Sequence, residues 1–351
     1  MLERLGPDAG AVLITDPLNV RYLTGFTGSN AQLLLDAKPV FYTDGRYDEQ
    51  SASQVPDLER VIYSGSKKFA DILKTTLGDR AISEVVVEGA HMSLAEADRL
   101  REALDGVVLV PRKDVVEAER MRKDADEIEA IRTAQHIAES ALSGVLERWR
   151  GGTEIDLALE IEWAMRTGGA EAVSFDIIVA SGAHSALPHA TPRDVAVDLD
   201  GVLLIDMGAK AGGYCSDMTR TYLGPKAPRE LVTAHNAVRA ALGAACEAVR
   251  PGAKGGDVDK AARDRLDAEG LAHTFVHSTG HGVGLDIHEA PSLAIGADEE
   301  LEPGMAVTVE PGVYLPGVGG IRIEDLLIVT DDGADNLTTL DRGHGVPRPG
   351  G

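Results

Sequence analysis

The hydrophobic pattern of this 351-residue chain changes near residue 118, and that change predicts two folding units. Before it, short apolar runs such as Gly10–Thr15 and Glu84–Glu88 alternate with helical periodicity, as in Ser93–Leu104. Alternation of strand and helix is typical of α/β structure. We therefore expect a small α/β domain over residues 1–118 and a second domain over residues 119–351.

The second unit opens with a long helical pattern. Asp124 is a candidate N-cap, and apolar residues recur at spacings of three and four from Ile128 to Leu146, which predicts a helix of about six turns. Thr153 is expected to cap a second helix. Helices that precede strands twice over indicate an α+β domain of two similar halves. Further helices are predicted over residues 228–249 and 258–269, and strands over Phe175–Ala180, Val202–Met207, Tyr214–Tyr222, Met305–Glu310 and Ile321–Val329.

Composition excludes several classes of function. The 57 acidic and 34 basic residues give a formal net charge of −23, which repels phosphate backbones and argues against a nucleic-acid partner. No apolar stretch approaches the roughly 20 residues that cross a bilayer, and the N-terminal segment lacks a signal-peptide core, so we expect a cytoplasmic protein without a membrane partner. Two cysteines, Cys215 and Cys246, are too few for a disulfide scaffold.

A pair of aspartates marks the first candidate site. Asp206 follows the apolar run Val202–Ile205, and after a glycine-rich turn the chain returns through Tyr214–Leu223 with Asp217 inside it. A return of this length lets the two carboxylates meet across an antiparallel hairpin. Two acids so placed are often only polar groups at strand ends, but both are expected to be buried. Buried carboxylates need a cation or a proton, so the pair points to a metal site.

A segment rich in histidine and glycine marks the second candidate site. A lone histidine is more often a satisfied core or surface residue than a functional group. Three within twelve residues, spaced by glycines, favour function. Glycine there lets the backbone approach a neighbour closely or adopt a positive φ. The residues are His277, His281 and His288, with Gly280, Gly282 and Gly284 between them.

Two glutamates mark the third candidate site. Glu310 ends an apolar run, and Glu324 lies in the segment that begins the next strand, where Arg322 points to the same face. Ile321 and Ile323 of that strand are expected to face the core. A glutamate at the end of a buried strand is costly unless it coordinates a cation.

These segments assemble a set of hard ligands. Four carboxylates and one imidazole suit Mn²⁺, with Co²⁺ or Zn²⁺ as alternatives, better than a thiolate-type zinc site. Four negative charges balance two divalent ions, and two metals about 3.5–4 Å apart can activate water and clamp a carbonyl. The set is Asp206, Asp217, His281, Glu310 and Glu324.

The order of these residues resembles that of the creatinase/methionine aminopeptidase superfamily, and most of all its Xaa-Pro peptidase branch, aminopeptidase P and prolidase. The resemblance covers the whole chain and implies a pita-bread catalytic domain behind a creatinase-type front domain. It is carried by LLIDMGAKAGGYCSDMTRT (from Leu203), HSTGHGVGLDIHE (from His277), VTVEPGVY (from Val307) and IRIED (from Ile321), and in front by NVRYLTGFTGSNA (from Asn19) and YTDGRYDEQ (from Tyr42).

The resemblance implies a role for each member of the ligand set. Asp206 would hold one metal ion, and His281 with Glu310 would hold the other. Asp217 and Glu324 would bridge both ions. Glu310 would also carry a proton to the leaving nitrogen.

Further residues acquire roles only through the resemblance. His189, in the segment LPHATP, would hold the substrate, and His288 would polarise the scissile carbonyl. His277 would line the proline pocket, and Tyr314 and Arg322 would lie near the site. His184, where the family leads us to expect a small amide residue, is interpreted as incidental. Cys215 shares a strand face with Asp217, but packing is its expected role.

Several functions stay open at this point. The main hypothesis is a two-metal Xaa-Pro peptidase acting on peptides with proline in second position. A methionine aminopeptidase is disfavoured because such enzymes usually lack this front domain. A non-catalytic peptide-binding relative is disfavoured because every ligand position is filled. A creatinase-like amidinohydrolase would work without the metal set.

Within the main hypothesis, aminopeptidase P is favoured over prolidase. A dipeptidase needs a group that caps the free carboxylate of its substrate, and no motif of this chain declares one. The segments TGFTGSN and YTDGRYDEQ also resemble the aminopeptidase P branch more closely. A homodimer is expected, since in this family a neighbouring subunit often borders the active site.

Overall fold

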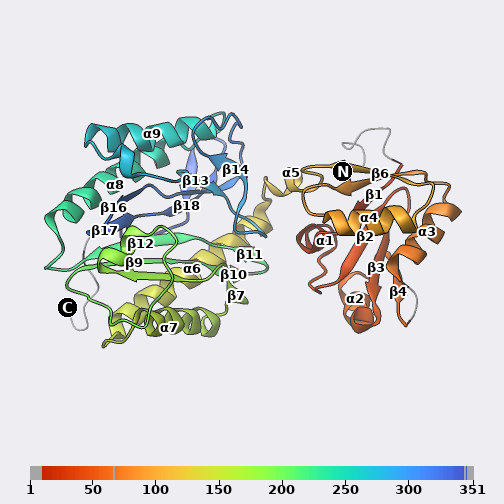
Figure 1. Ribbon diagram of the computed structural model, residues 1–351, viewed down its shortest axis with the longest axis horizontal. Coiled ribbons are helices and arrows are strands. Elements are labelled where there is room, and N and C mark those ends of the chain that lie inside the picture. Colours follow the sequence, from red (N-terminus) through yellow and green to blue (C-terminus); the bar gives the residue numbers. More distant parts are fainter. Residues whose placement is uncertain (1–9, 66–67, 344, 346–351) are drawn as a thin grey trace. The chain divides into compact units, whose positions relative to one another are not determined.

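The structure is a computed structural model that describes residues 10–65, 68–343 and 345 (Figure 1). The chain divides into two units, one ending at Arg120 and the other beginning at Met121. Among the described residues, no helix has the length and apolar character needed to cross a membrane.

The first unit is a mixed six-stranded sheet in the order β4-β3-β2-β1-β5-β6, with helices on both faces. Alternation of side chains along β1 explains the two layers. Leu13 packs with α3 and α4 on one face, while Val12 and Ile14 pack with α1 and with Val55, the residue after α2, on the other. The α/β prediction is therefore confirmed, although β4 and α2 were not among the predicted elements. In chain order the elements are β1 (Val12–Ile14), α1 (Pro17–Thr24), β2 (Ala31–Leu35), β3 (Val40–Asp44), α2 (Asp48–Gln54), β4 (Glu59–Tyr63), α3 (Phe69–Asp79), β5 (Glu84–Glu88), α4 (Leu94–Ala103), β6 (Val108–Arg112) and α5 (Glu117–Arg120).

The second unit repeats one arrangement, a pair of helices followed by strands. In Figure 1 the pair α6 and α7 and the pair α8 and α9 lie on opposite sides of the strands. Each pair contributes to a separate hydrophobic core, built mainly with the strands of its own half; Val202 of β9 and Leu223 of β12 join the core of α8 and α9. The elements of the first half are α6 (Ala125–Arg148), α7 (Glu154–Thr167), β7 (Ala172–Val173), β8 (Ile178–Ser181), β9 (Val202–Met207), β10 (Ala209–Ala211), β11 (Tyr214–Cys215) and β12 (Met218–Leu223). Those of the second half are α8 (Arg229–Ala248), α9 (Gly255–Ala268), β13 (Gly280–Gly282), β14 (Glu289–Leu293), β15 (Ala306–Val309), β16 (Gly312–Leu315), β17 (Gly319–Arg322), β18 (Asp325–Val329) and β19 (Ala334–Asn336).

The first two helices of this unit begin where the sequence predicts. The Asp124 side chain accepts hydrogen bonds from the first turn of α6, and Glu127 bonds back to the cap residue. Thr153 and Asp156 form the same reciprocal arrangement at the start of α7. Each arrangement satisfies backbone N–H groups that a helix start leaves without partners, so local sequence alone defines these starts.

Two strands predicted as continuous are interrupted. The run Tyr214–Tyr222 divides at Asp217, because β11 pairs with β10 while β12 pairs with β9 in another sheet. The run Ile321–Val329 divides at Glu324, because β17 pairs with β16 while β18 pairs with β15. Both predictions of an unbroken strand are wrong, and each break falls on a predicted ligand.

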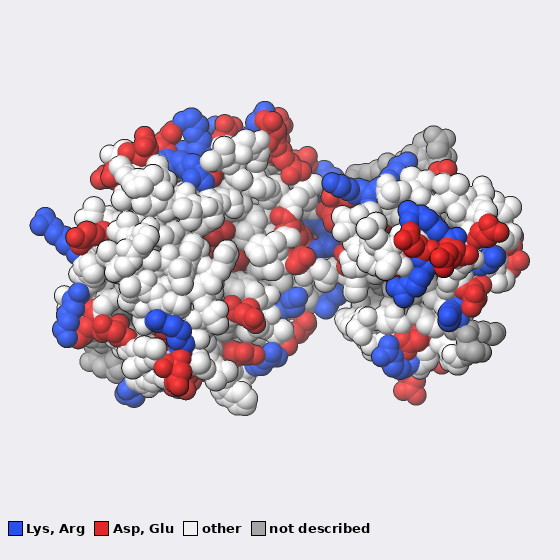
Figure 2. Space-filling model, in the orientation of Figure 1, with Lys and Arg blue, Asp and Glu red and all other residues white. Residues whose placement is uncertain are grey.

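Charged side chains of both signs are interspersed over the face of the molecule shown in Figure 2. The formal net charge of −23 is thus not collected into a single acidic patch on that face. Among the described residues most acidic side chains are at least partly accessible to solvent, and only a few, among them Asp206, Asp217 and Glu324, are buried.

Candidate active site

A cavity of about 520 Å³ opens in the second unit and receives residues from both of its halves. All five predicted metal ligands line it, together with four other predicted site residues, His189, His277, His288 and Arg322. The remaining lining residues are Phe175, Asp176, Ile178, Pro188, Ala190, Thr191, Ser278, Gly280, Ile287 and Ser292.

The first half supplies two aspartates from one antiparallel hairpin. Asp206 lies in β9, directly opposite Thr219 of β12 in the strand register. Asp217 lies two residues before Thr219, at the break between β11 and β12. Both aspartates are buried, and both reach the cavity, as the hairpin prediction requires.

The second half supplies one histidine and two glutamates from strand ends. His281 lies in β13, Glu310 directly follows β15, and Glu324 lies between β17 and β18. The glycines beside His281 let the backbone of β13 approach its neighbouring strand closely. A Cβ on Gly280 would lie 2.0 Å from the Thr308 carbonyl oxygen, so only glycine lets β13 lie this close to β15.

Hydrogen bonding fixes the tautomer of His281. Its Nδ1 lies 3.0 Å from the Gly282 carbonyl oxygen, which can only accept, so Nδ1 carries the proton. Burial lowers the pKa of His281 to about 4, so the ring is neutral near pH 7 and Nε2 keeps a lone pair. That Nε2 lies 3.6 Å from Asp217 Oδ2 and 3.6 Å from Glu310 Oε1. One imidazole nitrogen with a free lone pair and two carboxylate oxygens, all potential metal ligands, therefore face one another.

The carboxylates of the ligand set lie close enough to repel one another when they are ionised. Burial, together with neighbouring carboxylates, raises the pKa values of Asp217 and Glu324 well above their usual range, and burial raises that of Glu310 to about 8. One oxygen of Asp206, Oδ1, is buried without a hydrogen-bond partner. Ligand atoms of Asp217, His281 and Glu324 all lie within 4.8 Å of one another. The donor set thus fits divalent cations, whose charge would relieve these costs.

A chain of hydrogen bonds runs along one side of the cavity. Arg322 donates to Asp206 Oδ2 at 2.5 Å and to the Tyr314 hydroxyl at 2.8 Å. The same hydroxyl lies 2.8 Å from His277 Nε2, while His277 Nδ1 lies 2.8 Å from the Ser278 carbonyl oxygen. The carbonyl requires a proton on Nδ1, so the Tyr314 hydroxyl donates to Nε2. Tyr314 is not among the residues that line the cavity, and it acts on the site through these two neighbours.

Two of the predicted site histidines are exposed to solvent. His189 and His288 line the cavity, yet both are exposed, whereas Asp206, Asp217 and Glu324 are buried. The His288 ring meets the His281 ring edge to face at 4.5 Å. His184 does not line the cavity, and its Nε2 lies 3.1 Å from the Thr191 carbonyl oxygen.

Cys215 does not line the cavity and packs in a hydrophobic cluster instead. It is buried among Ile131, Val283, Ala306 and Leu326. Burial raises the pKa of its thiol, which keeps it protonated near neutral pH. A packing role agrees with the expectation from sequence.

Sequence reasoning missed two residues. Asp176 lines the cavity just before β8, and its only signal was an acid in front of an apolar run. Thr219 is fully buried and donates to Glu324 Oε2 at 2.7 Å. No spacing pattern singles out a threonine inside a strand, so this contact emerges only from the structure.

Comparison with known proteins places this arrangement in a family. Residues 129–331 match the model of metallopeptidase family M24, and residues 3–122 match that of the creatinase/prolidase N-terminal domain. The chain belongs to metallopeptidase family M24. As a member of M24 it is a peptidase that depends on divalent metal ions, in agreement with the donor set of the cavity.

Similar M24 proteins cover nearly the whole chain. An Xaa-Pro dipeptidase of Pyrococcus furiosus is 32% identical over 333 residues, 94% of this chain and 94% of that protein. The solved structure of an Xaa-Pro dipeptidase from Bacillus anthracis has 37% identity and a TM-score of 0.92 over 96% of this chain and 94% of its own. That of an X-Pro aminopeptidase from Thermotoga maritima has 36% identity and a TM-score of 0.91, covering 98% and 99%. The predicted pita-bread fold behind a creatinase-type domain is confirmed.

Proposed function

We propose that this M24 peptidase removes the N-terminal residue of peptides that carry proline in second position, with two divalent ions at its centre. The observation that carries the proposal is the convergence of four carboxylates and a neutral imidazole on one cavity. Similar proteins, named as Xaa-Pro dipeptidases and an X-Pro aminopeptidase, supply the bond class.

The five ligand candidates divide between two ions. Asp206 would hold one ion, since its Oδ1 is buried without a partner. His281 and Glu310 would hold the other, because His281 Nε2 faces Glu310 Oε1. Asp217 and Glu324 would contact both, which fits their burial beside one another and their raised pKa values. Mn²⁺ is the proposed metal because the donors are mostly hard oxygens.

Divalent ions bound in such a site activate water and polarise the scissile carbonyl. The side chains around them handle protons and developing charge. Glu310 would accept a proton and deliver it to the proline nitrogen, which must leave as an amine. His189 and His288, at the exposed side of the cavity, would donate hydrogen bonds to the carbonyl oxygen as negative charge develops on it.

Proline in second position suits this chemistry. A bond to proline has no N–H, so a site that reacts through the carbonyl and the leaving nitrogen loses nothing by its absence. The neutral His277 ring, fixed by Tyr314 and by Ser278, offers a rigid wall for the proline ring.

The choice between aminopeptidase and dipeptidase turns on Arg322. A dipeptidase needs a cation for the free carboxylate that follows proline. Among the described residues that line the cavity there is one arginine and no lysine. All three nitrogens of this guanidinium already donate, Nε to Thr219, Nη1 to Pro188 and Tyr314, and Nη2 to Asp206. We therefore favour peptides of three or more residues. Xaa-Pro dipeptides are the second candidate, because the similar protein from Bacillus anthracis is named a dipeptidase.

One experiment separates these possibilities. Metal-replete protein is offered matched Xaa-Pro, Xaa-Pro-Xaa and Xaa-Ala-Xaa peptides, and kcat/KM is measured for each. The proposal predicts the highest value for Xaa-Pro-Xaa and the loss of most of the rate with Xaa-Ala-Xaa. A preference for the dipeptide would select the prolidase alternative. Equal rates on proline and alanine peptides would refute the assignment to proline.

Assembly as a homodimer and a cytoplasmic location stay predictions from the sequence. Sedimentation at micromolar concentration tests the first. A fully active monomer would refute it.

A further inference from the structure

Thr219 touches two of the groups that shape the metal centre. Its side chain is fully buried at the start of β12, and its position in the strand register is directly opposite Asp206. The hydroxyl donates to Glu324 Oε2 at 2.7 Å and accepts from Arg322 Nε at 3.0 Å. Arg322 in turn donates to Asp206 Oδ2 at 2.5 Å.

The chemistry of the partners fixes the direction of both hydrogen bonds. A guanidinium nitrogen can only donate, and a carboxylate that binds metal is ionised and can only accept. The Thr219 hydroxyl is therefore used fully, with its hydrogen toward Glu324 and a lone pair toward Arg322. An apolar side chain of the same shape makes neither hydrogen bond. Glu324 and Arg322 would then each stay buried with one hydrogen bond missing.

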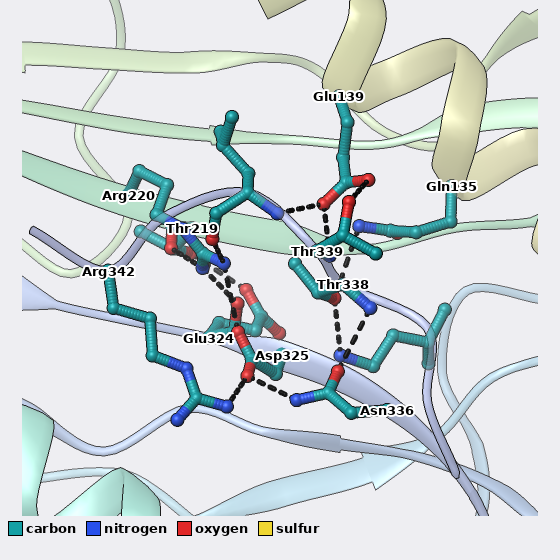
Figure 3. A network of polar contacts seen from close by, with 12 residues as sticks. Gln135, Glu139, Thr219, Arg220, Glu324, Asp325, Asn336, Thr338, Thr339 and Arg342 are labelled. Atoms are coloured by element: carbon teal, nitrogen blue, oxygen red, sulfur yellow. Dashed lines mark hydrogen bonds and ion pairs between the residues drawn. The ribbon is translucent and has the colours of Figure 1, made fainter.

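The backbone of Thr219 is equally constrained. Its carbonyl oxygen accepts from the Glu324 N–H at 3.1 Å. Arg220, fully buried, donates through Nη1 to the carbonyl oxygens of both Thr219 and Glu324, at 3.0 and 2.6 Å. Figure 3 shows Thr219 and Arg220 of β12 beside Glu324, which lies between β17 and β18. The hydroxyl is thus presented to Glu324 from a backbone that is itself held in place.

We propose that Thr219 is a positioning residue of the metal centre. Its hydroxyl sets the orientation of the Glu324 carboxylate directly and that of the Asp206 carboxylate through Arg322. One side chain would then couple a ligand shared by both ions to a ligand of one ion. The inference rests on the proposed function, since it concerns how these carboxylates meet metal.

A substitution that keeps the shape and removes the hydroxyl tests the proposal. Thr219→Val does so, Thr219→Ser restores the hydroxyl, and Thr221→Val is a matched control on the same face of β12. The Thr221 hydroxyl donates to the Arg322 carbonyl oxygen at 2.8 Å and accepts from the Arg322 N–H at 3.1 Å, without touching a predicted ligand.

The measurement is the titration of metal-free protein with Co²⁺, followed by calorimetry and by the visible absorption of the bound ion. Thr219→Val is expected to weaken binding about 10–100-fold, as loss of a partner of a metal ligand typically does, and to shift the absorption bands. Thr219→Ser should bind like the unaltered protein. Thr221→Val should lose thermal stability while its affinity and spectrum stay unchanged.

The outcomes separate this inference from the proposed function. Unaltered affinity and spectrum in Thr219→Val would overturn the positioning role, and so would equal weakening in Thr221→Val. Failure of the unaltered protein to bind Co²⁺ would instead overturn the proposed function. If Thr219→Val does not fold, Thr219→Cys replaces it. The thiol is a weaker hydrogen-bond donor than a hydroxyl, so the Co²⁺ affinity of Thr219→Cys should be lower than that of Thr219→Ser. Equal affinities of these two variants would refute the positioning role.

Discussion

Two adjacent residues, Glu324 and Asp325, face two regions that bury carboxylates in opposite ways. Asp325 is fully buried, and it receives hydrogen bonds or ion pairs from Arg220, Arg342 and Asn336 (Figure 3). Two guanidinium groups and an amide surround one carboxylate, so this region contains its own compensating charge. Nothing further has to bind there to make burial tolerable.

Glu324 faces the cavity, where the balance is reversed. The four ligand carboxylates, those of Asp206, Asp217, Glu310 and Glu324, share it with a fifth acid, Asp176. Among the described residues that line the cavity there is one guanidinium, that of Arg322. The imidazole of the ligand set is neutral near pH 7 and adds no charge. Raised pKa values of three of the four carboxylates report the cost.

The contrast separates structural from functional burial. Where the chain supplies the partners of a buried acid, the acid stabilises the fold. Where the chain does not supply such partners, the acids serve to bind a cation from solution. The predictions below test this distinction, beginning with the largest expected effect.

Removal of metal, or of a charge shared by both ions, should abolish hydrolysis. Chelation of the unaltered protein, Asp217→Asn and Glu324→Gln are each expected to leave no measurable turnover, because the remaining carboxylates cannot retain both ions. Metal content by elemental analysis should fall in parallel with activity. Full activity in chelated protein would remove the distinction between the two regions.

Stability of the metal-free protein should respond in opposite directions on the two sides. Arg220→Met removes one of the two guanidinium partners of Asp325 and the donor to three carbonyl oxygens, so it should lower the free energy of unfolding by about 3–5 kcal/mol. Glu324→Gln removes one of several repelling carboxylates and should leave that free energy unchanged or higher. Denaturant unfolding of both variants without metal makes the comparison.

A surface ion pair provides the control for that result. Lys226 lies 2.8 Å from Asp200, but its side chain is 76% exposed, so Lys226→Met should change stability by no more than about 1 kcal/mol. A loss in Glu324→Gln as large as that in Arg220→Met would mean that both carboxylates are structural.

The histidines at the cavity should affect turnover without affecting metal content. His189→Ala and His288→Ala are expected to lower kcat about 10²–10³-fold, the usual cost of removing one donor to a developing oxyanion. His184→Ala, outside the cavity, should change little. Loss of metal from either of the first two variants would place that histidine among the ligands.

A third buried carboxylate extends the comparison to pH. Burial alone would raise the pKa of Glu154, but hydrogen bonds from Arg193 and Ser181 outweigh it and lower the pKa to about 2. A lowered folded-state pKa contributes stability that is present above the unfolded-state value and is lost as pH falls toward 2. Glu154→Gln should therefore be less stable than the unaltered protein near pH 7, by roughly 1.5–3 kcal/mol. Unfolding curves should converge near pH 2, and a difference independent of pH would contradict this account.

The sequence predicted the residues that line the cavity better than the buried residues that hydrogen-bond to them. Carboxylates such as Asp206 and Glu310 stand out because each ends an apolar run, where an acid is costly unless it has a function. Arg220 and Thr219 gave no such signal. The partner of Arg220, Asp325, lies 105 positions away in the chain, and only the folded structure brings the two together.

The interruptions of the strands were unpredictable for a related reason. Apolar alternation continues through Asp217 and Glu324, so local pattern favours unbroken strands. Pairing with different sheets on either side breaks them, and strand pairing is a long-range property. The helix starts at Asp124 and Thr153 were predictable because their hydrogen bonds are local.

The most direct test of the central claim is a titration of metal-free protein with Mn²⁺, followed by calorimetry, with hydrolysis of an Xaa-Pro-Xaa peptide measured at each step. The account predicts two ions bound per chain and activity that rises with their binding. In Glu324→Gln, tight binding and activity should both be lost, while Lys226→Met should match the unaltered protein. Hydrolysis at full rate before any ion binds, or no binding by the unaltered protein, would contradict the claim that these carboxylates are held for metal.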